Sequence, residues 1–296
     1  MRQPAAFEGL GIVERFLSVA LEITSSTLVL VLVSLGLAVI FGLVRVINMG
    51  HGAMLALGAY LTWTFTGEGL PFPLAVIGAT IGVGVIGLIF EALVIRHFYE
   101  KPFETLLISW GFYLVVTELI KVVWGSTLKN IRNPMPGTFS LGEAGIGRYE
   151  AVVCGMSVLL MAGTGLLLYR TSIGVKVRAM IQNREMALML GVNAPRMYRA
   201  VFVAGAAMAG LAGALIAPMF SIEPDMGTLW LVRSFFAVIV GGLGAIVSGT
   251  LVGSLLIGGG TVLFALVSEQ VFAQTVVFAL AVVALRFRPV GILGRR

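Results

Sequence analysis

The chain has 296 residues, of which 58% are hydrophobic and 11% charged, and its mean hydropathy is +1.02. A soluble protein of this length needs more polar surface, so the composition predicts an all-α, polytopic integral membrane protein. The formal net charge is +6, but ten of the twenty basic residues fall in 170–199 and in the tail from Arg286, a clustering that marks membrane topology and excludes a nucleic-acid groove.

Charged and Pro-rich stretches divide the chain into about eight or nine predicted transmembrane helices, some of them discontinuous. Residues 1–24 are interrupted by charges and are predicted to form an N-terminal interfacial segment, without the pattern of a cleaved signal peptide. Residues 25–296 form one transmembrane domain. The nine predicted spans are 25–47, 53–65, 74–95, 105–124, 151–169, 200–220, 229–246, 250–267 and 271–285, with the N-terminus outside and the C-terminus inside. Eight spans are the alternative, because 53–65 and 271–285 are short.

Two glycine-rich stretches predict helix breaks at membrane depth. One follows the first span, and the other lies between Gly241 and Gly249, because the uncharged run 234–268 would make a single helix of about 52 Å. Non-helical backbone is tolerated at that depth only where it lines a cavity or is buried in protein. We therefore predict a substrate path at Asn48, Gly50, His51, Gly52, Gly241, Gly242 and Gly244. Alternatively, the glycines only allow close helix packing, and His51 caps a backbone carbonyl.

The longest polar stretch is 170–199, with six basic residues against one acid, Glu185. Loops rich in Lys and Arg stay in the cytoplasm, so this loop and the C-terminal tail are predicted to be cytoplasmic. Apolar residues at helical spacing predict one helix over 173–190, ended by Gly191, with a stripe of Val177, Met180, Ile181 and Leu188. The stripe would bind a partner protein or, alternatively, the helix would lie on anionic lipid.

Several blocks in this order resemble the permease subunits of branched-chain amino-acid ABC transporters, of the LivH type. They are NMGHGAMLALGAY at 48–60, RTSIGVKVRAMIQNREMALMLGV at 170–192, FVAGAAMAGLAGAL at 202–215, VIVGGLGAIVSGTLVGSLLIG at 238–258 and RPVGILGR at 288–295. The resemblance extends over nearly the whole chain from about residue 25.

The resemblance implies a permease subunit of a bacterial ABC importer, multi-pass in the inner membrane. Its partners would be two ATP-binding cassette subunits, a second permease subunit that differs from this one, a periplasmic or lipid-anchored substrate-binding protein, and membrane lipid. The 170–199 loop would then couple to the ATPases. The residues expected to do so are Gly174, Arg178, Met180, Asn183, Arg184, Ala187 and Gly191.

No catalytic residue, cofactor or metal site is predicted, because the chain lacks a Walker A pattern and has only two histidines and one cysteine. The chain is therefore not expected to be an enzyme. QNREMA at 182–187 and EPDMG at 223–227 also resemble urea-type permeases, which leaves a urea or short-chain amide importer as an alternative.

An ion-coupled secondary transporter is the alternative from another class. It would carry an ionisable residue deep in the membrane, and Glu91 is the only acid well inside a predicted span, close to its inner end. Arg233, near the outer end of its span, is expected to extend its charge towards water.

Overall fold

The computed structural model describes residues 12–44, 48–141, 144–242, 244–288 and 290–294. Helices make up most of this part of the chain, which confirms the all-α class. In chain order they are α1 (Ile12–Val44), α2 (Gly50–Gly67), α3 (Phe72–Leu93), the short 3₁₀ turn η2 (Ile95–His97), α4 (Pro102–Trp124), α5 (Arg148–Arg170), α6 (Ser172–Gln182), α7 (Arg184–Met189), α8 (Ala194–Ile216), α9 (Met226–Gly241), α10 (Ile246–Ser254), the π-helical turn η3 (Leu255–Gly259), α11 (Gly260–Ala265) and α12 (Gln270–Phe287). Two strands, β1 (Thr138–Leu141) and β2 (Ala144–Gly147), form an antiparallel hairpin.

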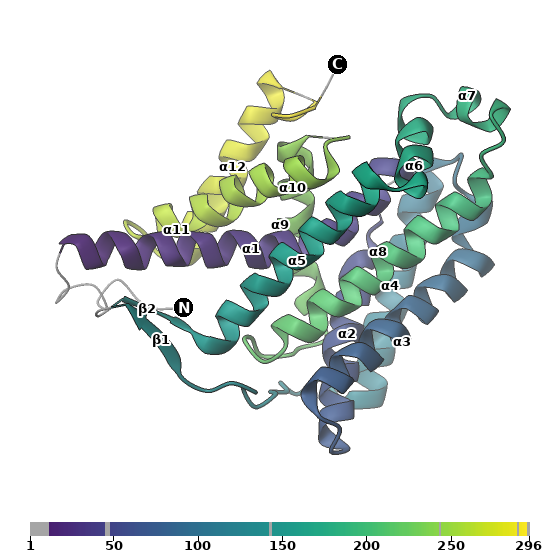
Figure 1. The fold of residues 1–296 in the computed structure, drawn as a ribbon. Helices are drawn as coiled ribbons and strands as arrows, with labels where there is room; N and C mark the ends of the chain where they lie inside the picture. Colours follow the sequence, from purple (N-terminus) through teal and green to yellow (C-terminus); the bar gives the residue numbers. More distant parts are fainter. Residues whose placement is uncertain (1–11, 45–47, 142–143, 243, 289, 295–296) are drawn as a thin grey trace.

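The long helices run between two ends of the molecule (Figure 1). We call one end the coupling face; it carries α6, α7 and the 94–101 connection, which are joined by an ion pair between Arg184 and Glu100. The other end, the hairpin face, carries β1, β2 and the 217–225 connection. There the backbones of Lys129 and Ile222 pair with each other. Successive long helices alternate in direction between these two faces.

Seven segments of the described chain are long and apolar enough to cross a membrane: α1, α3 with η2, α4, α5, α8, the continuous run α10–η3–α11, and α12. The two remaining long helices, α2 and α9, fill the predicted positions but are more polar or shorter. With them, nine segments alternate through the described part of the protein. The protein is thus a polytopic, all-α membrane protein, as predicted.

Several element boundaries differ from the prediction. Helix α1 runs unbroken for 33 residues from Ile12, so no helix ends at residue 24; the interfacial location of 1–24 stays a prediction, and residues 1–11 lie outside the described residues. The loop over 125–150 contains the β1–β2 hairpin, which was not predicted. Helix α2 begins at Gly50 and not at residue 53, which makes it 18 residues long.

The second predicted helix break is confirmed with small changes of boundary. Helix α9 ends at Gly241 and α10 begins at Ile246, so the break is short. Between Ser254 and Gly260 the helix widens into the π-helical turn η3, which hydropathy alone could not indicate.

Helix α8 is the centre of the bundle and packs against α1, α2 and α3. Its small residues bring backbones into direct contact: a Cβ added at Gly213 would lie 1.9 Å from the Leu55 carbonyl oxygen, and one at Gly58 would lie 2.2 Å from the Gly210 carbonyl oxygen. Close approach of this kind stabilises helix pairs in lipid, where association has no hydrophobic driving force. The small residues of α8 therefore form a packing surface.

The alternation of helices generates a prediction about topology. With the coupling face in the cytoplasm, a cysteine at Glu223 should react with a membrane-impermeant maleimide in intact cells, whereas a cysteine at Thr171 should react only after permeabilisation. Both side chains are exposed, and the native Cys154 would first be replaced by Ser. Labelling of Thr171→Cys in intact cells would show that the orientation is inverted.

Candidate functional site

The first candidate stretch, Asn48 to Gly52, forms the start of α2 and is buried inside the helix bundle. Asn48 and His51 are 2% and 0% exposed. The Asn48 Oδ1 accepts a hydrogen bond from the Gly50 N–H at 3.0 Å, and the His51 Nε2 lies 3.1 Å from the Val33 carbonyl oxygen, to which it can donate. Among the described residues, the Asn48 Nδ2 and the His51 Nδ1 have no hydrogen-bond partner. Each side chain thus keeps one polar atom available in an apolar interior.

The N-terminal ends of α2 and α9 meet at two glycines. A Cβ at Gly52 would lie 2.5 Å from the Gly227 carbonyl oxygen, and a Cβ at Gly227 would lie 2.3 Å from the Gly52 carbonyl oxygen. Gly50 similarly leaves room for the ring of Phe112. The first N–H groups of a helix have no partner within that helix and carry partial positive charge. Two such ends therefore come together beside His51, and the glycines permit that approach.

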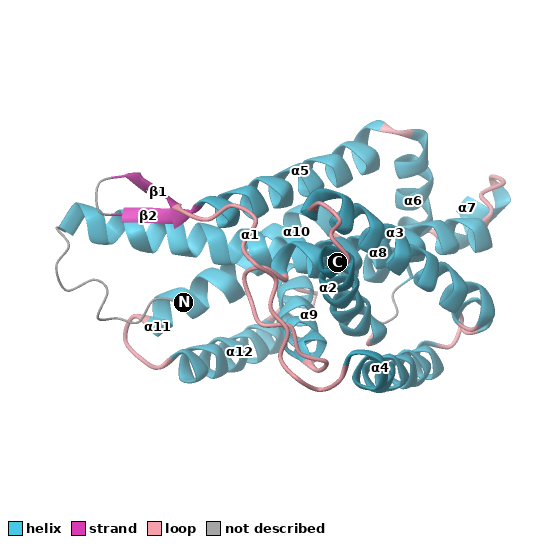
Figure 2. Ribbon diagram, turned by 90° about the horizontal axis from the view of Figure 1, so that it is seen from below, coloured by secondary structure: helices cyan, strands magenta, loops and turns pink. Residues whose placement is uncertain are grey.

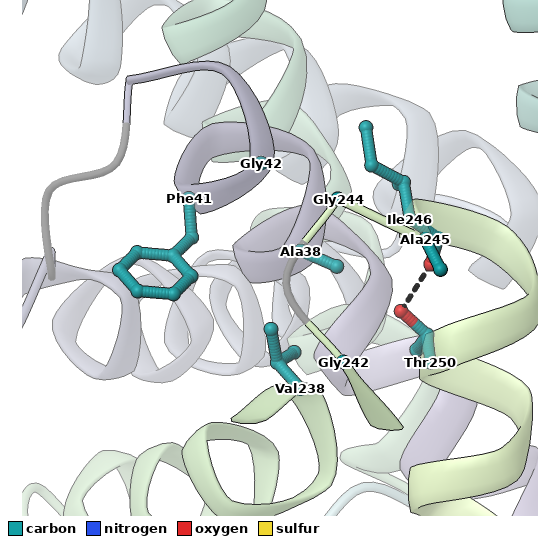
Figure 3. Close-up of a pocket in the computed structure, with 9 residues that line it drawn as sticks. All are labelled: Ala38, Phe41, Gly42, Val238, Gly242, Gly244, Ala245, Ile246 and Thr250. Carbon is teal, nitrogen blue, oxygen red and sulfur yellow. Dashed lines mark hydrogen bonds between the residues drawn. The ribbon is translucent and has the colours of Figure 1, made fainter. Parts of the chain in front are cut away.

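The second candidate stretch lies at the coupling face, where α9 turns into α10. Gly241 packs against the Gly249 backbone, and Gly242 and Gly244 have φ angles of +119° and +96°, which favour glycine. A cavity of about 10 Å³ lies here, with room for a single water (Figure 3). Its lining residues are Ala38, Phe41, Gly42, Val238, Gly242, Gly244, Ala245, Ile246 and Thr250.

The two candidate stretches contact the same helix at different heights. The His51 ring approaches Gly36 of α1, and Ile246 approaches Gly42 of α1. These positions are six residues apart, which corresponds to about 9 Å along a helix axis. The structure therefore places the two stretches at different heights and on different faces of α1 and does not merge them into one site.

The predicted single helix over 173–190 is in fact two helices. The Thr171 Oγ1 accepts a hydrogen bond from the Gly174 N–H and caps α6, and the Asn183 Oδ1 accepts from the Met186 N–H and caps α7. Because an N-cap residue leaves the helical conformation, Asn183 separates the two helices. The stop at Gly191 is confirmed, since its φ of +83° ends the segment.

The predicted apolar stripe is buried against its own chain, contrary to the expectation that it is exposed for a partner. Of the stripe, Val177 and Met180 are 3% and 4% exposed and Ile181 is half-buried. These residues, together with Ala187, which is 1% exposed, pack in a cluster with residues of α1 and α8. A Cβ at Gly174 would lie 2.2 Å from the Leu168 carbonyl oxygen. Only Leu188 of the stripe is exposed.

The exposed apolar surface of this region lies at other positions. Met189 and Leu190 are 82% and 77% exposed, and Met186 is 55% exposed. The basic residues nearby are oriented by aromatic rings: the guanidinium of Arg178 lies 5.2 Å from the Tyr169 ring centroid, and that of Arg184 lies 5.9 Å from the Tyr198 ring centroid. The coupling face therefore presents apolar side chains on α7 beside fixed cations.

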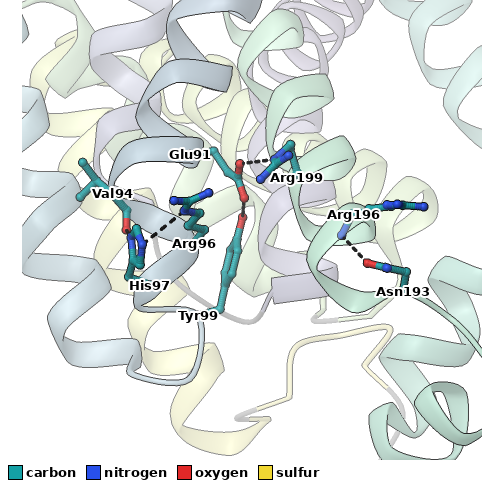
Figure 4. A network of polar contacts seen from close by, with 8 residues as sticks. All are labelled: Glu91, Val94, Arg96, His97, Tyr99, Asn193, Arg196 and Arg199. Carbon is teal, nitrogen blue, oxygen red and sulfur yellow. Dashed lines mark hydrogen bonds and ion pairs between the residues drawn. The ribbon is translucent and has the colours of Figure 1, made fainter.

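A polar network that the sequence did not predict joins α3, α8 and the 94–101 connection (Figure 4). Glu91 is 1% exposed; its Oε2 accepts a hydrogen bond from the Arg199 Nε at 2.8 Å and its Oε1 accepts from the Tyr99 hydroxyl at 3.0 Å. Burial, together with the adjacent Glu91 carboxylate, raises the pKa of Tyr99 far above its usual range. Tyr99 thus remains a proton donor to Glu91 at physiological pH.

The same network continues towards α7. The Tyr99 and Tyr198 ring centroids lie 4.8 Å apart, and Arg184 pairs with Glu100 at 2.8 Å. The only acid predicted well inside a span is therefore half of an ion pair, so the one residue that the ion-coupled alternative could have used is already bound to Arg199.

The sequence profile of the family described as "Branched-chain amino acid transport system / permease component" matches residues 19–285. The chain belongs to this family. This permease is 28% identical over 281 residues to the high-affinity branched-chain amino acid transport system permease protein BraD of Pseudomonas aeruginosa, an alignment that covers 89% of this chain and 91% of BraD. The permease protein LivH of Escherichia coli K12 is 25% identical over 284 residues, with the same coverage.

Two further relatives match a smaller share of the chain. The probable branched-chain amino acid transport permease protein LivH of Methanocaldococcus jannaschii is 31% identical over 77% of this permease and 75% of its own length. The fructose import permease protein FrcC of Rhizobium meliloti is 28% identical over 72% of this permease and 61% of its own length. No solved structure matches this permease. Permeases of ABC importers work with ATPase and substrate-binding components.

The Glu91 network predicts an asymmetric response to mutation. The Arg199 side chain is 41% exposed and can be solvated without its partner, whereas Glu91 cannot. Arg199→Gln should therefore lower the free energy of unfolding by about 3 kcal/mol, since it leaves a buried charge unpaired. Glu91→Gln should lower it by clearly less, and the double variant should recover part of the loss.

Unfolding of the purified permease in detergent, followed by tryptophan fluorescence, measures these differences. Arg196→Gln is the matched control, because Arg196 is an exposed arginine of the same helix and forms none of the described ion pairs. Equal losses for Glu91→Gln and Arg199→Gln would contradict the assigned roles.

Proposed function

We propose that this chain is one of two transmembrane permease subunits of an ABC importer that carries branched-chain amino acids across the bacterial inner membrane. The alignment with BraD and LivH over 89% of the chain carries this proposal. The permease would do no covalent chemistry; separate ATPase subunits would hydrolyse ATP, and a binding protein would deliver the substrate to the hairpin face. The second permease subunit would be a different chain, and the C-terminus would be cytoplasmic.

An uptake assay tests which substrate the importer carries. The complete importer, reconstituted in proteoliposomes with ATP inside and its binding protein outside, should accumulate labelled leucine, isoleucine or valine. Urea and acetamide serve as the alternative substrates, since the sequence also resembles urea-type permeases. Accumulation of urea without accumulation of any of the three amino acids would replace the proposal by the alternative.

The coupling surface is proposed to be α7 and the residues that follow it. Met186, Met189 and Leu190 are exposed on the coupling face, where Arg178 and Arg184 stand beside them. A helix that inserts into a groove of its partner uses a few apolar anchors, and flanking cations can pair with acidic residues there. Gly174, Met180 and Ala187 then act indirectly, since their burial holds α6 and α7 in position, and Asn183 and Gly191 fix the ends of α7.

The substrate path is proposed to pass the meeting point of α2 and α9. Asn48 and His51 offer polar atoms that no described residue binds, and polar side chains inside a membrane mark substrate pathways. Gly50 and Gly52 allow the helix ends to approach, and Gly241, Gly242 and Gly244 form the break nearer the coupling face. The free polar atoms of this site can form hydrogen bonds with the ammonium and carboxylate groups of an amino acid.

The coupling proposal predicts different effects at an exposed and a buried position. Met189→Glu should leave the permease folded, because the side chain is 82% exposed, but should weaken capture of the ATPase subunits about tenfold or more. Ala187→Glu should reduce both thermal stability and ATPase capture, since it places a charge at a position that is 1% exposed.

Pull-down of the ATPase subunits and thermal unfolding of the same preparations separate the two effects. Leu128→Glu is the control, because Leu128 is an exposed apolar residue on the hairpin face. Wild-type capture by Met189→Glu would show that α7 does not bind the ATPase.

The path proposal predicts loss of uptake without loss of assembly. His51→Leu and Asn48→Leu conserve much of the side-chain volume but remove the free polar atoms, so leucine uptake should fall several-fold while ATPase capture stays unchanged. Ser157→Ala serves as the control for loss of a buried polar group, because Ser157 is buried on α5, far in sequence from Asn48 and His51. If both Leu variants transport normally, these residues only pack.

A further inference from the structure

Arg233 is a partly buried charged side chain between α9 and α12 for which the described residues supply no acidic partner. It is the eighth residue of the sixteen-residue helix α9. Its guanidinium donates a hydrogen bond to the Gln274 Oε1 of α12 at 2.7 Å and lies 5.5 Å from the ring centroid of Trp230. None of the ion pairs in the described part of the chain includes it.

The contacts of Arg233 fix its position without neutralising its charge. An arginine guanidinium has five N–H donors in a planar fork that matches a carboxylate. Gln274 takes one of these donors and Trp230 covers one face of the group, so several donors remain for a ligand. The guanidinium is thus held against α12, and its extension towards water stays a prediction.

Arg233 lies on a part of α9 that has α12 and α4 as neighbours and exposed apolar residues beside it. Figure 2 shows α9 between α12 and α4, and the Tyr113 hydroxyl lies 2.5 Å from the Thr228 Oγ1, which joins α4 to α9. Leu229 and Val232, next to Arg233 on α9, are 47% and 37% exposed. Arginines within membranes almost always face a protein interior or a water-filled cavity, and not lipid. This side of α9 is therefore expected to face the second permease or the path between the two.

We propose that Arg233 is a carboxylate-binding residue that holds the α-carboxylate of the amino acid in transit. The inference rests on the proposed import of amino acids and assigns a charged contact to the part of α9 that bonds to α12. A carboxylate is the ligand that fits an unpaired, oriented guanidinium best, because two parallel N–H···O bonds form at once. An acidic side chain of the second permease would supply the same chemistry, and the two sources can be distinguished.

The test uses the complete importer in proteoliposomes with Arg233→Gln, Arg233→Lys and the control Gln274→Leu. Arg233→Gln keeps an amide that can bond to Gln274 but removes the charge, so the KM for leucine should rise at least about tenfold, the value of a charge-assisted hydrogen bond. The KM of Arg233→Lys for leucine should lie between the values of Arg233→Gln and the wild type. Gln274→Leu keeps the guanidinium and should have a clearly smaller effect.

Retention of the second permease subunit distinguishes a carboxylate of the substrate from one of that subunit. If the substrate supplies it, Arg233→Gln should retain the second permease subunit and the basal ATPase rate, and guanidinium ion should partly restore uptake by Arg233→Ala. Loss of the second subunit from Arg233→Gln would assign the carboxylate to that subunit and overturn the substrate contact. Equal defects in Arg233→Gln and Gln274→Leu would reduce Arg233 to a link between α9 and α12 and overturn the proposal.

The wild-type measurement separates this inference from the proposed function. If the wild-type importer takes up none of the three branched-chain amino acids, the proposed function fails. If it takes up leucine and Arg233→Gln does so with an unchanged KM, only the carboxylate assignment fails.

Discussion

Backbone contact between α8 and its neighbours is the constraint on which the other features depend. Lipid offers no hydrophobic driving force for helix association, so the helices must gain dispersion energy by close approach. Gly210 and Gly213 of α8 meet Gly58 and Leu55 of α2 at distances that no larger side chain would allow. This contact sets the position of α2, and with it the depth at which the α2 N-terminus and His51 lie within the bundle.

Much of the fold could be predicted from the sequence because lipid restricts the possible structures. Backbone polar groups must be satisfied within helices, so hydropathy and charge locate the crossing segments. The helix break near Gly241 followed from length alone, since an uncharged run of that length exceeds the bilayer. The β1–β2 hairpin and the π-helical turn η3 could not be predicted in this way, because neither changes the hydropathy of its segment.

The site was harder to predict, for two physical reasons. Helical periodicity identifies an apolar stripe but does not say what covers it, and the Val177 stripe proved to be covered by α1 and α8. Asn183 was noted as part of the coupling loop, yet its capping of α7 depends on local backbone geometry that competes with a continuous helix. Glu91 was correctly located near the end of its span, but its partner Arg199 is 108 residues away in the sequence.

The Glu91 network gives the coupling face a mechanical property. Arg199 belongs to the first turns of α8, Tyr99 belongs to the turn between α3 and α4, and Arg184 of α7 is tied to that turn through Glu100. Side-chain contacts thus connect α7 to the α3–α4 turn, and that turn to α8, with the exposed Arg184–Glu100 pair as the link at α7. Because α8 is in backbone contact with α2, the same chain of contacts continues to the helix that begins beside His51. The coupling face and the start of α2 in the middle of the bundle are thus joined by one continuous set of side-chain and backbone contacts that runs through α8.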